Sequence, residues 1–489
     1  MTEVHNLAAR LGRDTEATAL VVGERTTTYR ALNDRVGRWR GALIASGLRP
    51  GDRVAIIASN SEEFVVAHLA AMGVGAISVP MNPQSPAAEL ARELSAVDPF
   101  VAIADATAEK TLMAAKVLTL TLEVQRLSAD ELDAGLPHDI VEVSPDDPAA
   151  LIFTSGTAGE SKPAILTHRN LTAGLQSILS LPTDLLERPQ VFLGVIPMFH
   201  IFGLNSVLHM SLLIGATLVL SDYVGPAQTA DLIERHRVTI VSGPPTLWRA
   251  LTQVPQVGPD TFSSVSLAVS GASRLPPQLK VDVRERLGIE LSEGYGLTES
   301  SAVAASSVAT DAPLGSVGRL LPGVEARIVD VEENDCLVGD PGELWIRGPM
   351  VFPGYWGSVE GGPSPLTADG WLRTGDVAVV DDEGYIAIVD RSKDLIIVSG
   401  FNVFPAEVEA VLNEHPDVAL AGVVGEPAES TGEAVVAFVM PEEGASVDAE
   451  TLRDHCRRHL ARYKVPSRFV IAPDLPVGPT GKLQRNRLV

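Results

Sequence analysis

A run of hydroxyl-bearing and glycine residues follows a short apolar stretch about a third of the way along the chain. The run reads TSGTAGESK over residues 154–162 and comes directly after Leu151, Ile152 and Phe153. Successive backbone N–H groups in such a turn form an anion-binding nest, hydroxyls donate to phosphate oxygens, and a lysine adds positive charge. The run therefore predicts a phosphate-binding turn, whose candidate residues are Thr154, Ser155, Gly156, Thr157, Gly159 and Lys162.

The order of residues in this turn excludes one familiar kind of phosphate site. A Walker A loop reads GxxxxGK[ST], whereas here Lys162 is followed by Pro163. P-loop kinases and GTPases are therefore disfavoured. The alternative to a phosphate site is a flexible surface loop.

The elements that must position the turn alternate between strands and helices up to about residue 312. Apolar strand-like runs at 54–58, 76–80 and 100–104 are separated by helical segments. Thr28 is predicted to cap one helix, and Asn60 with Glu63 resembles a capping box for another. Strands that alternate with helices predict parallel sheets covered on both faces, which is an α/β fold.

The pattern changes after that point. Short strands with glycine turns and no helices between them predict a small antiparallel β-barrel or sheet at about 313–390. From Lys393 onward the pattern predicts an α+β unit. Its expected helices and strands lie at 405–415, 418–424, 433–440, 449–462 and 468–472.

Composition excludes several classes of protein. The 489 residues include 38 Lys and Arg against 62 Asp and Glu, a net charge of −24, which disfavours nucleic acid and anionic membranes as partners. The two cysteines, Cys336 and Cys456, exclude a disulfide framework and a cysteine zinc site and favour a cytoplasmic location. The uncharged stretch at 191–221 contains proline, histidines and glycines, so a strand, a loop and a buried helix are favoured over a membrane span.

The turn at 154–162 resembles the phosphate loop of the adenylate-forming superfamily, which includes acyl-CoA synthetases, aryl-CoA ligases, luciferases and nonribosomal-peptide adenylation domains. That loop usually reads TSGTTGxPK, so this chain departs from it at Ala158 and Ser161. Four further motifs occur in the family's order. They are YGLTE at 295–299, WLRTGD at 371–376, DRSKD at 390–394 and PTGK at 479–482.

The resemblance implies a domain organisation and a reaction. It implies a large N-terminal AMP-binding domain at 1–392, with α/β subdomains and a small β-barrel, and a mobile α+β C-terminal domain at 393–489. In the implied reaction, a carboxylate attacks the α-phosphate of ATP, giving acyl-AMP and pyrophosphate. The thiol of coenzyme A then displaces AMP.

The resemblance also assigns roles at the reacting centre. It implies that Lys482 is the catalytic lysine, that Thr298 holds the α-phosphate, and that Glu299 binds Mg2+ together with Thr154. His200 lies in PMFHIFG and resembles the residue that lines and gates the acyl pocket. Taken singly, each has an ordinary structural explanation, such as a solvated C-terminal lysine or a core histidine.

Other residues resemble family positions around the nucleotide and the thiol. The adenine elements correspond to Gly271, Ala272, Ser273, Gly294, Tyr295 and Gly296. Asp376 resembles the carboxylate that accepts from the ribose hydroxyls, and Arg391 resembles a residue at the ribose or phosphate. Lys393 resembles the hinge, and the segment presented to the thiol corresponds to Ser399, Gly400 and Phe401.

The residues around His200 indicate which class of carboxylic acid the protein would activate. They are apolar and include no Asp to pair with an α-ammonium group, so a fatty or aryl acid is favoured over an amino acid. The segment 393–416 most resembles bacterial medium- and long-chain fatty-acid–CoA ligases. Two alternatives stay open: an enzyme that passes the acyl group to a carrier protein, and a catalytically impaired nucleotide- or acyl-binding module. ATP, Mg2+ and coenzyme A are the expected cofactors of a monomer or homodimer.

Overall fold

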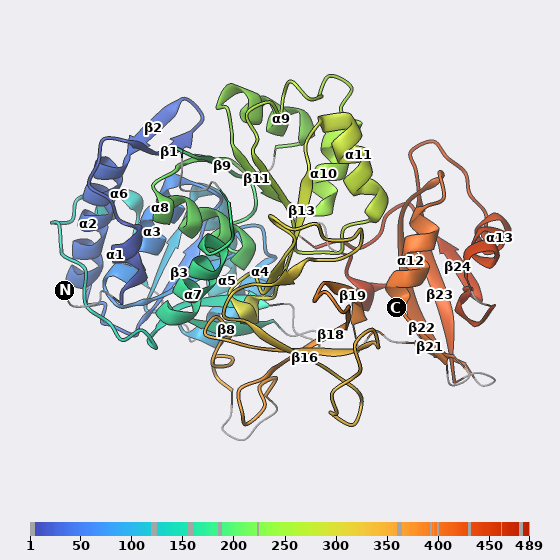
Figure 1. Ribbon diagram of the computed structural model, residues 1–489. Coiled ribbons are helices and arrows are strands. Elements are labelled where there is room, and N and C mark those ends of the chain that lie inside the picture. The colour runs from blue at the N-terminus through green and yellow to red at the C-terminus, as the bar shows by residue number, and fades with distance from the viewer. Residues whose placement is uncertain are drawn as a thin grey trace. The chain divides into compact units, whose positions relative to one another are not determined.

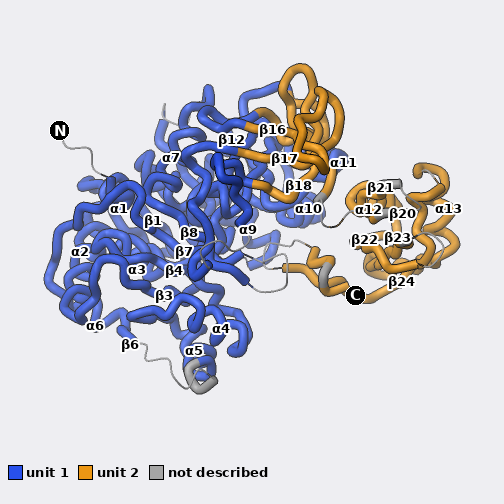
Figure 2. Tube along the Cα trace, turned by 90° about the horizontal axis from the view of Figure 1, so that it is seen from below, with its two compact units in different colours: residues 1–311, 320–325, 347–372 blue, residues 312–319, 326–346, 373–489 orange. Residues whose placement is uncertain are grey.

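The structure is a computed structural model (Figure 1). It describes residues 5–118, 125–154, 161–183, 188–222, 224–358, 364–391, 394, 396–398, 401–428, 432–460, 462–478 and 483–488. Contacts within the chain define two compact units (Figure 2). The first comprises residues 1–311, 320–325 and 347–372, and the second comprises 312–319, 326–346 and 373–489. The predicted α/β class is confirmed, whereas the boundary at residue 393 stays a prediction.

One sheet of the first unit has six strands, in the order β6(Gln125–Arg126), β5(Val101–Ala104), β3(Arg53–Ile57), β4(Ile77–Met81), β7(Pro148–Thr154) and β8(Lys162–Thr167). The strands from β6 to β7 run parallel, and β8 returns antiparallel to β7. Helices α4(Ala87–Val97) and α5(Ala106–Leu118) pack on it through a core that includes Ile57, Leu90 and Leu112. Helix α3(Glu62–Gly73) also contacts β3 and β4.

The other sheet of the first unit has nine strands. Their order is β15(Arg319–Leu320), β14(Ala305–Ser306), β13(Leu291–Tyr295), β12(Leu267–Ser270), β11(Ile240–Gly243), β9(Val191–Gly194), β10(Thr217–Leu220), β1(Thr18–Val22) and β2(Arg25–Thr28). The strands from β13 to β1 are parallel, whereas β14 and β2 pair antiparallel with their neighbours. The carboxyl edge of such a sheet is where ligands usually bind.

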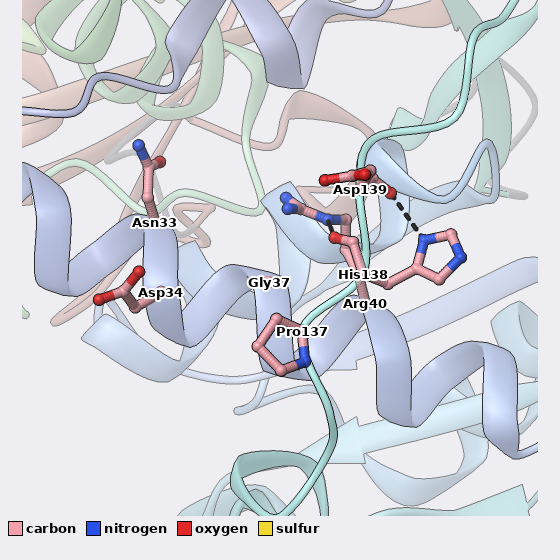
Figure 3. A pocket seen from close by; sticks show the side chains of 7 residues that line it. All are labelled: Asn33, Asp34, Gly37, Arg40, Pro137, His138 and Asp139. Atoms are coloured by element: carbon pink, nitrogen blue, oxygen red, sulfur yellow. Dashed lines mark hydrogen bonds between the residues drawn. The ribbon is translucent and has the colours of Figure 1, made fainter.

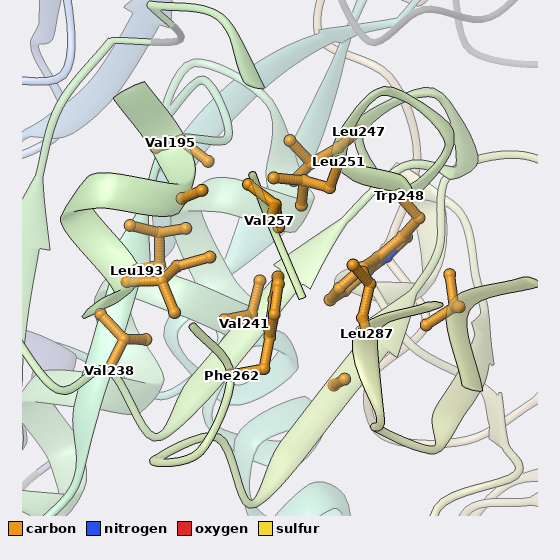
Figure 4. Close-up of a cluster of buried hydrophobic side chains, with 14 of the residues drawn as sticks. Leu193, Val195, Val238, Val241, Leu247, Trp248, Leu251, Val257, Phe262 and Leu287 are labelled. Atoms are coloured by element: carbon orange, nitrogen blue, oxygen red, sulfur yellow. The ribbon is translucent and has the colours of Figure 1, made fainter. Parts of the chain in front are cut away.

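Three helices pack against this nine-stranded sheet. They are α9(Pro226–Arg235), α10(Pro245–Gln253) and α11(Pro277–Leu287). Their apolar side chains share a core with the strands, in which Trp248 and Leu287 lie beside Val241 and Phe262 (Figure 4). This packing holds the carboxyl ends of β11, β12 and β13 in place.

The remaining helices of the first unit are α1(Leu7–Leu11), α2(Tyr29–Ala45), α6(Ala129–Asp133), α7(His168–Leu179), the π-helix η1(Phe202–His209), α8(Met210–Ile214) and the 3-10 helix η2(Thr298–Ser300). None of the helices in the described part of the chain is long and apolar enough to cross a membrane. The stretch at 191–221 forms β9, η1, α8 and β10, as its composition predicts.

Two predicted helix caps have different outcomes. Thr28 caps α2 by accepting from the Ala31 backbone N–H, as expected. The prediction for Asn60 was wrong, because Ser61 caps α3 and accepts from Phe64 N. The amide of Asn60 instead donates to Gly194 O and Ile196 O, so a tertiary contact has replaced the local cap.

The second unit contains two smaller sheets. In the segment expected to form a barrel or sheet, the structure has a four-stranded sheet ordered β16(Glu325–Val329), β17(Gly342–Arg347), β18(Leu372–Val380) and β19(Ile386–Arg391). The expected α+β part is confirmed. Its sheet is ordered β21(Phe401–Val403), β20(Ile396–Val398), β23(Gly432–Pro441) and β22(Val418–Ala428), with β24(Arg468–Ile471) beside β23. Helices α12(Pro405–Asn413) and α13(Ala449–His459) share its core.

Candidate active site

The base of the glycine-rich turn is closed by two antiparallel strands. Thr154 ends β7 and lies opposite Lys162, which begins β8. The Thr154 hydroxyl donates to Lys162 O at 3.3 Å, and the Ser161 hydroxyl donates to Thr154 O at 3.2 Å. This pairing brings the two ends of the turn together. Ser155, Gly156, Thr157 and Gly159 lie outside the described residues.

Tyr355 connects this turn to Glu299. Its hydroxyl donates to Glu299 Oε1 at 2.6 Å and lies close enough to the Thr154 side chain to interact with it. The Lys162 Nζ lies 5.8 Å from the centre of the Tyr355 ring. Three predicted site residues, Thr154, Lys162 and Glu299, therefore gather around one phenol that the sequence analysis did not single out.

Backbone pairing puts Tyr355 in this position. Ile165 N donates to Gly354 O at 3.0 Å, and Trp356 N donates to Pro163 O at 2.8 Å, so the segment 354–356 lies along β8. Burial raises the pKa of Tyr355 above its ordinary value, and the neighbouring Glu299 carboxylate adds to the effect. The phenol therefore stays protonated at neutral pH and can donate to that carboxylate.

The donor set at Glu299 fits a magnesium ion held jointly with phosphates. Among the described residues there is no group of three or more His, Cys, Asp or Glu side chains able to hold a metal. Mg2+ is commonly bound by one or two carboxylates together with substrate phosphates, and not by a cage made of protein alone. One carboxylate, Glu299, near the Thr154 hydroxyl matches that pattern. Thr298 precedes Glu299 in the short helix η2(Thr298–Ser300).

The predicted adenine elements come together at the carboxyl ends of β12 and β13. Gly271, Ala272 and Ser273 follow β12, while Gly294 and Tyr295 end β13. A Cβ on Gly271 would lie 3.3 Å from the Phe202 ring and 3.5 Å from Gly294 O. These backbones therefore approach one another closely.

Gly296 continues this close approach. A Cβ on Gly296 would lie 2.1 Å from Ala302 O, so only glycine fits there. Gly296 thus allows the segment that leads from β13 into η2 to pack against the backbone of Ala302 and Val303, which follow η2.

His200 lies at the start of the segment that forms η1. Its Nδ1 accepts from Phe202 N at 3.3 Å, and its side chain is partly exposed. Gly203 lets η1 approach the preceding loop, because a Cβ there would lie 2.4 Å from Pro197 O. Since Phe202 lies against Gly271, the segment around His200 adjoins the predicted adenine elements. Turns of π-helix occur frequently at functional sites.

The remaining predicted residues belong to the second unit. Asp376 on β18 is 4% exposed and lies opposite Arg391 of β19 in the strand register. The Asp376 backbone N–H donates to Thr374 Oγ1, which itself donates to Leu344 O. Nothing further is described of the Arg391 and Phe401 side chains. Lys393, Ser399, Gly400 and Lys482 lie outside the described residues.

Sequence reasoning missed two charged groups in addition to Tyr355. Glu93 on α4 is 8% exposed and is hydrogen-bonded to the Ser161 side chain, and burial raises its pKa to about 7. Arg485 pairs with Asp390 at 3.0 Å, with Asp394 at 2.9 Å and with Glu409 at 2.6 Å. Neither has a local sequence signal, because each depends on partners far away in the chain.

A polar pocket lies elsewhere in the first unit (Figure 3). It is formed by α2 and the segment 137–139, where Arg40 Nε donates to His138 O. Its lining residues are Asn33, Asp34, Gly37, Arg40, Pro137, His138 and Asp139. None of the predicted site residues contributes to it, so it is separate from the candidate active site.

Known proteins resemble this chain along nearly its whole length. Residues 7–356 match the family described as AMP-binding enzyme, and residues 407–482 match the AMP-binding enzyme C-terminal domain. A 4-coumarate–CoA ligase-like protein of Oryza sativa subsp. japonica is 34% identical, over 95% of this chain and 88% of that protein. The long-chain-fatty-acid–CoA ligase of Bacillus subtilis is 31% identical, over 96% of this chain and 90% of the ligase.

A solved structure also resembles this chain in its fold along nearly the whole length. The crystal structure of ATP-bound MatB from Rhodopseudomonas palustris is 30% identical to this chain and has a TM-score of 0.91. The match covers 99% of this chain and 98% of that one.

Proposed function

This chain belongs to the AMP-binding enzyme family, and we propose that it activates a carboxylic acid with ATP and transfers the acyl group to coenzyme A. In the first step a carboxylate oxygen of the acid bonds to the α-phosphorus of ATP, and pyrophosphate leaves. In the second step the sulfur of coenzyme A bonds to the acyl carbon. The bond from that carbon to the AMP oxygen breaks, and AMP leaves.

The observation that carries this proposal is the arrangement of Thr154, Lys162 and Glu299 around Tyr355. A hydroxyl, an ammonium group and a carboxylate beside a glycine-rich turn are suited to ATP phosphates and their metal ion. Both steps move negative charge on phosphate or acyl oxygens, so donors and cations held in advance supply most of the catalysis. The turn at 155–160 and Lys162 would bind the phosphates, and Thr298 would donate to the α-phosphate.

Glu299 and Thr154 would hold the magnesium ion. When bound, such an ion would neutralise negative charge on the ATP phosphates. The Tyr355 hydroxyl keeps one oxygen of Glu299 oriented by hydrogen bonding, which leaves the other oxygen available. Lys482 would place its ammonium group between the carboxylate and the α-phosphate, reducing the repulsion between two anions.

The residues that resemble the family's nucleoside-binding positions are proposed to have the following roles. Gly271, Ala272, Ser273, Gly294, Tyr295 and Gly296 would bind adenine. Asp376 would accept from the ribose hydroxyls, and Arg391 would assist at the ribose or phosphate. We propose that the chain from residue 393 onward acts as a mobile domain. It would turn at Lys393 to bring either Lys482 or the segment at Ser399, Gly400 and Phe401 to the reacting centre.

The acid is proposed to be a medium- or long-chain fatty acid. The support is the apolar surroundings of His200, where Phe202, Leu204 and Leu208 are buried on η1. An aryl acid is the second candidate, favoured by the 34% identity to the 4-coumarate–CoA ligase-like protein. His200 would line and gate the acyl pocket in either case.

The test is pyrophosphate exchange into ATP with a panel of fatty, hydroxycinnamic and amino acids, followed by addition of coenzyme A or an acyl-carrier protein. We expect exchange with a fatty acid, and acyl-CoA once coenzyme A is present. The Glu299→Gln variant should lose most of the exchange, whereas Glu24→Gln, at an exposed site, should keep it. Acyl-AMP that accumulates despite coenzyme A would favour a carrier-protein acceptor. No exchange with any acid would favour an impaired binding module.

A further inference from the structure

A line of buried hydrogen bonds runs from β4 to the turn that follows Glu299. Ser78 Oγ lies 2.7 Å from His68 Nδ1, and His68 Nε2 lies 2.7 Å from His209 Nε2. His209 Nδ1 lies 2.9 Å from Asn205 Oδ1, and Asn205 Nδ2 lies 2.9 Å from Ser301 O. Each of the five residues is no more than 1% exposed. The line joins α3, β4 and η1 to the segment that carries Glu299.

The hydrogen-bond partners determine which atom donates and which accepts in each bond of this line. Asn205 Nδ2 donates to Ser301 O, so Oδ1 is the acceptor, and His209 Nδ1 must carry the proton. Burial lowers the pKa of His209 well below its ordinary value and that of His68 to about 3, so both rings are neutral. His209 Nε2 therefore accepts from His68 Nε2–H, and His68 Nδ1 accepts from the Ser78 hydroxyl. Each donor in the line meets one acceptor.

The end of the line is a turn of unusual backbone conformation. Ser301 has a φ of +56° and Ala302 a φ of +98°, values that residues with a side chain rarely adopt. Ser301 N donates to Thr298 O, and the Ser301 hydroxyl donates to Met350 O. Such a conformation persists only where surrounding contacts hold it. The bond from Asn205 to Ser301 O is one of those contacts, two residues from Glu299.

The elements around Asn205 leave room for this bond. Asn205 and His209 lie four residues apart on the π-helix η1, and both side chains take part in the line. Across from them, Gly174 of α7 has no side chain. A Cβ there would lie 3.2 Å from Asn205 Nδ2 and 3.3 Å from Ser301 O. A larger residue at 174 would therefore press on the contact.

We propose that Asn205 is a positioning residue for Glu299, and that the His68–His209 pair holds the Asn205 amide in the orientation that donates to Ser301 O. Without His209, the Asn205 Oδ1 loses its donor, and the amide is held only through the bonds that its Nδ2 donates to Ser301 O and Leu171 O. The Glu299 backbone, which also accepts from Phe352 N, would then have one of its supports weakened. This inference rests on the proposed role of Glu299 as the metal ligand.

The test is Mn2+ binding to the full-length protein with α,β-methylene-ATP, in which free Mn2+ is counted by electron paramagnetic resonance. Asn205→Leu removes the donor and keeps a similar size, and we expect it to weaken Mn2+ binding about tenfold, as loss of an outer-shell partner typically does. His209→Leu should weaken it in the same direction by a smaller factor. If Asn205→Leu does not fold, as judged by circular dichroism, His209→Leu decides the question.

Two controls separate this inference from the proposed function. Thr229→Val alters another buried polar residue, on α9, whose hydroxyl donates to Gly225 O and lies outside the line, and should leave Mn2+ binding unchanged. Glu299→Gln should weaken metal binding more than Asn205→Leu or His209→Leu does. If it does so while the folded Asn205 and His209 variants bind Mn2+ like the wild type, the positioning role is overturned and the function stands. If Glu299→Gln binds Mn2+ normally, the assignment of Glu299 as a metal ligand falls, and the positioning role falls with it.

Discussion

The hydroxyl of Tyr355 donates to Glu299 Oε1 at 2.6 Å, across 56 residues of sequence. The same hydroxyl lies close enough to interact with the Thr154 side chain, at the base of the glycine-rich turn. One phenol thus links the carboxylate proposed to bind the metal with the turn proposed to bind phosphate. Its segment is held along β8 by two backbone hydrogen bonds.

Replacement of Tyr355 by phenylalanine should slow adenylation without unfolding the protein. The change removes one hydrogen bond to a charged group, worth about 1.5–3 kcal/mol, so kcat/KM for pyrophosphate exchange should fall about 10- to 100-fold. Tyr385→Phe is the matched control, because that ring packs under Arg319 in the second unit. Equal exchange rates in Tyr355→Phe and the wild type would show that the phenol does not orient Glu299.

The buried carboxyl of Glu93 should make stability depend on pH. Burial raises its folded pKa to about 7, above the unfolded value near 4.5, so the folded state holds the proton longer. Its stabilising contribution is therefore complete below pH 4.5 and is lost as the pH rises toward 7. When the pH is raised from 5.5 to 8, the free energy of unfolding of Glu93→Gln should therefore increase by about 2 kcal/mol relative to that of the wild type.

The measurement for Glu93 is the urea midpoint of variant and wild type at both pH values. Glu24→Gln, whose side chain is 95% exposed, is the control and should show no such change. A gap between Glu93→Gln and the wild type that stays constant with pH would contradict the raised pKa.

Loss of Arg485 should destabilise the second unit. Its guanidinium pairs with Asp390, Asp394 and Glu409, and the Asp390 side chain is only 1% exposed. Removing one partner of a buried pair leaves an uncompensated charge and typically costs about 3–5 kcal/mol. Arg485→Ala should therefore melt earlier and be cut faster by protease in residues 373–489.

Arg457→Ala is the matched control for Arg485→Ala. Arg457 pairs with Asp454 on α13, and both side chains are more than half exposed. Such a pair contributes at most about 1 kcal/mol. Equal melting temperatures for the two variants would mean that the Arg485 cluster adds no stability.

Replacement of Lys482 by alanine should affect the two steps of the reaction unequally. Loss of one donor that stabilises transition-state charge usually lowers the rate about 100- to 1000-fold, and we expect that loss in pyrophosphate exchange. Transfer of the acyl group from supplied acyl-AMP to coenzyme A should continue, because that step is assigned to the other face of the C-terminal domain. Lys110→Ala, at an exposed position on α5, should change neither step. Normal exchange in Lys482→Ala would refute the assignment.

Features encoded by local sequence could be predicted. The cap at Thr28 and the alternation of strands and helices both depend on residues close together in the chain, and the structure has both. The grouping of Thr154 and Lys162 also follows from a local turn between two strands.

Features that depend on distant partners could not be predicted. Tyr355 reaches Thr154 and Glu299 only because its segment pairs with β8. His68 meets His209 across 141 residues, and neither has a motif. Asn60 looked like a helix cap because its spacing to Glu63 is right, but its amide bonds to the end of β9 instead. In each case a tertiary hydrogen bond decided the role of the side chain.

The central claim is tested most directly by following an oxygen atom. The protein is incubated with ATP, Mg2+, coenzyme A and a fatty acid whose carboxylate carries heavy oxygen, and AMP is then weighed by mass spectrometry. If the acid attacks the α-phosphate, acyl-CoA forms and the AMP released carries one heavy oxygen from the acid. Acyl-CoA formed together with unlabelled AMP, or with ADP and phosphate, would contradict activation through an acyl-adenylate.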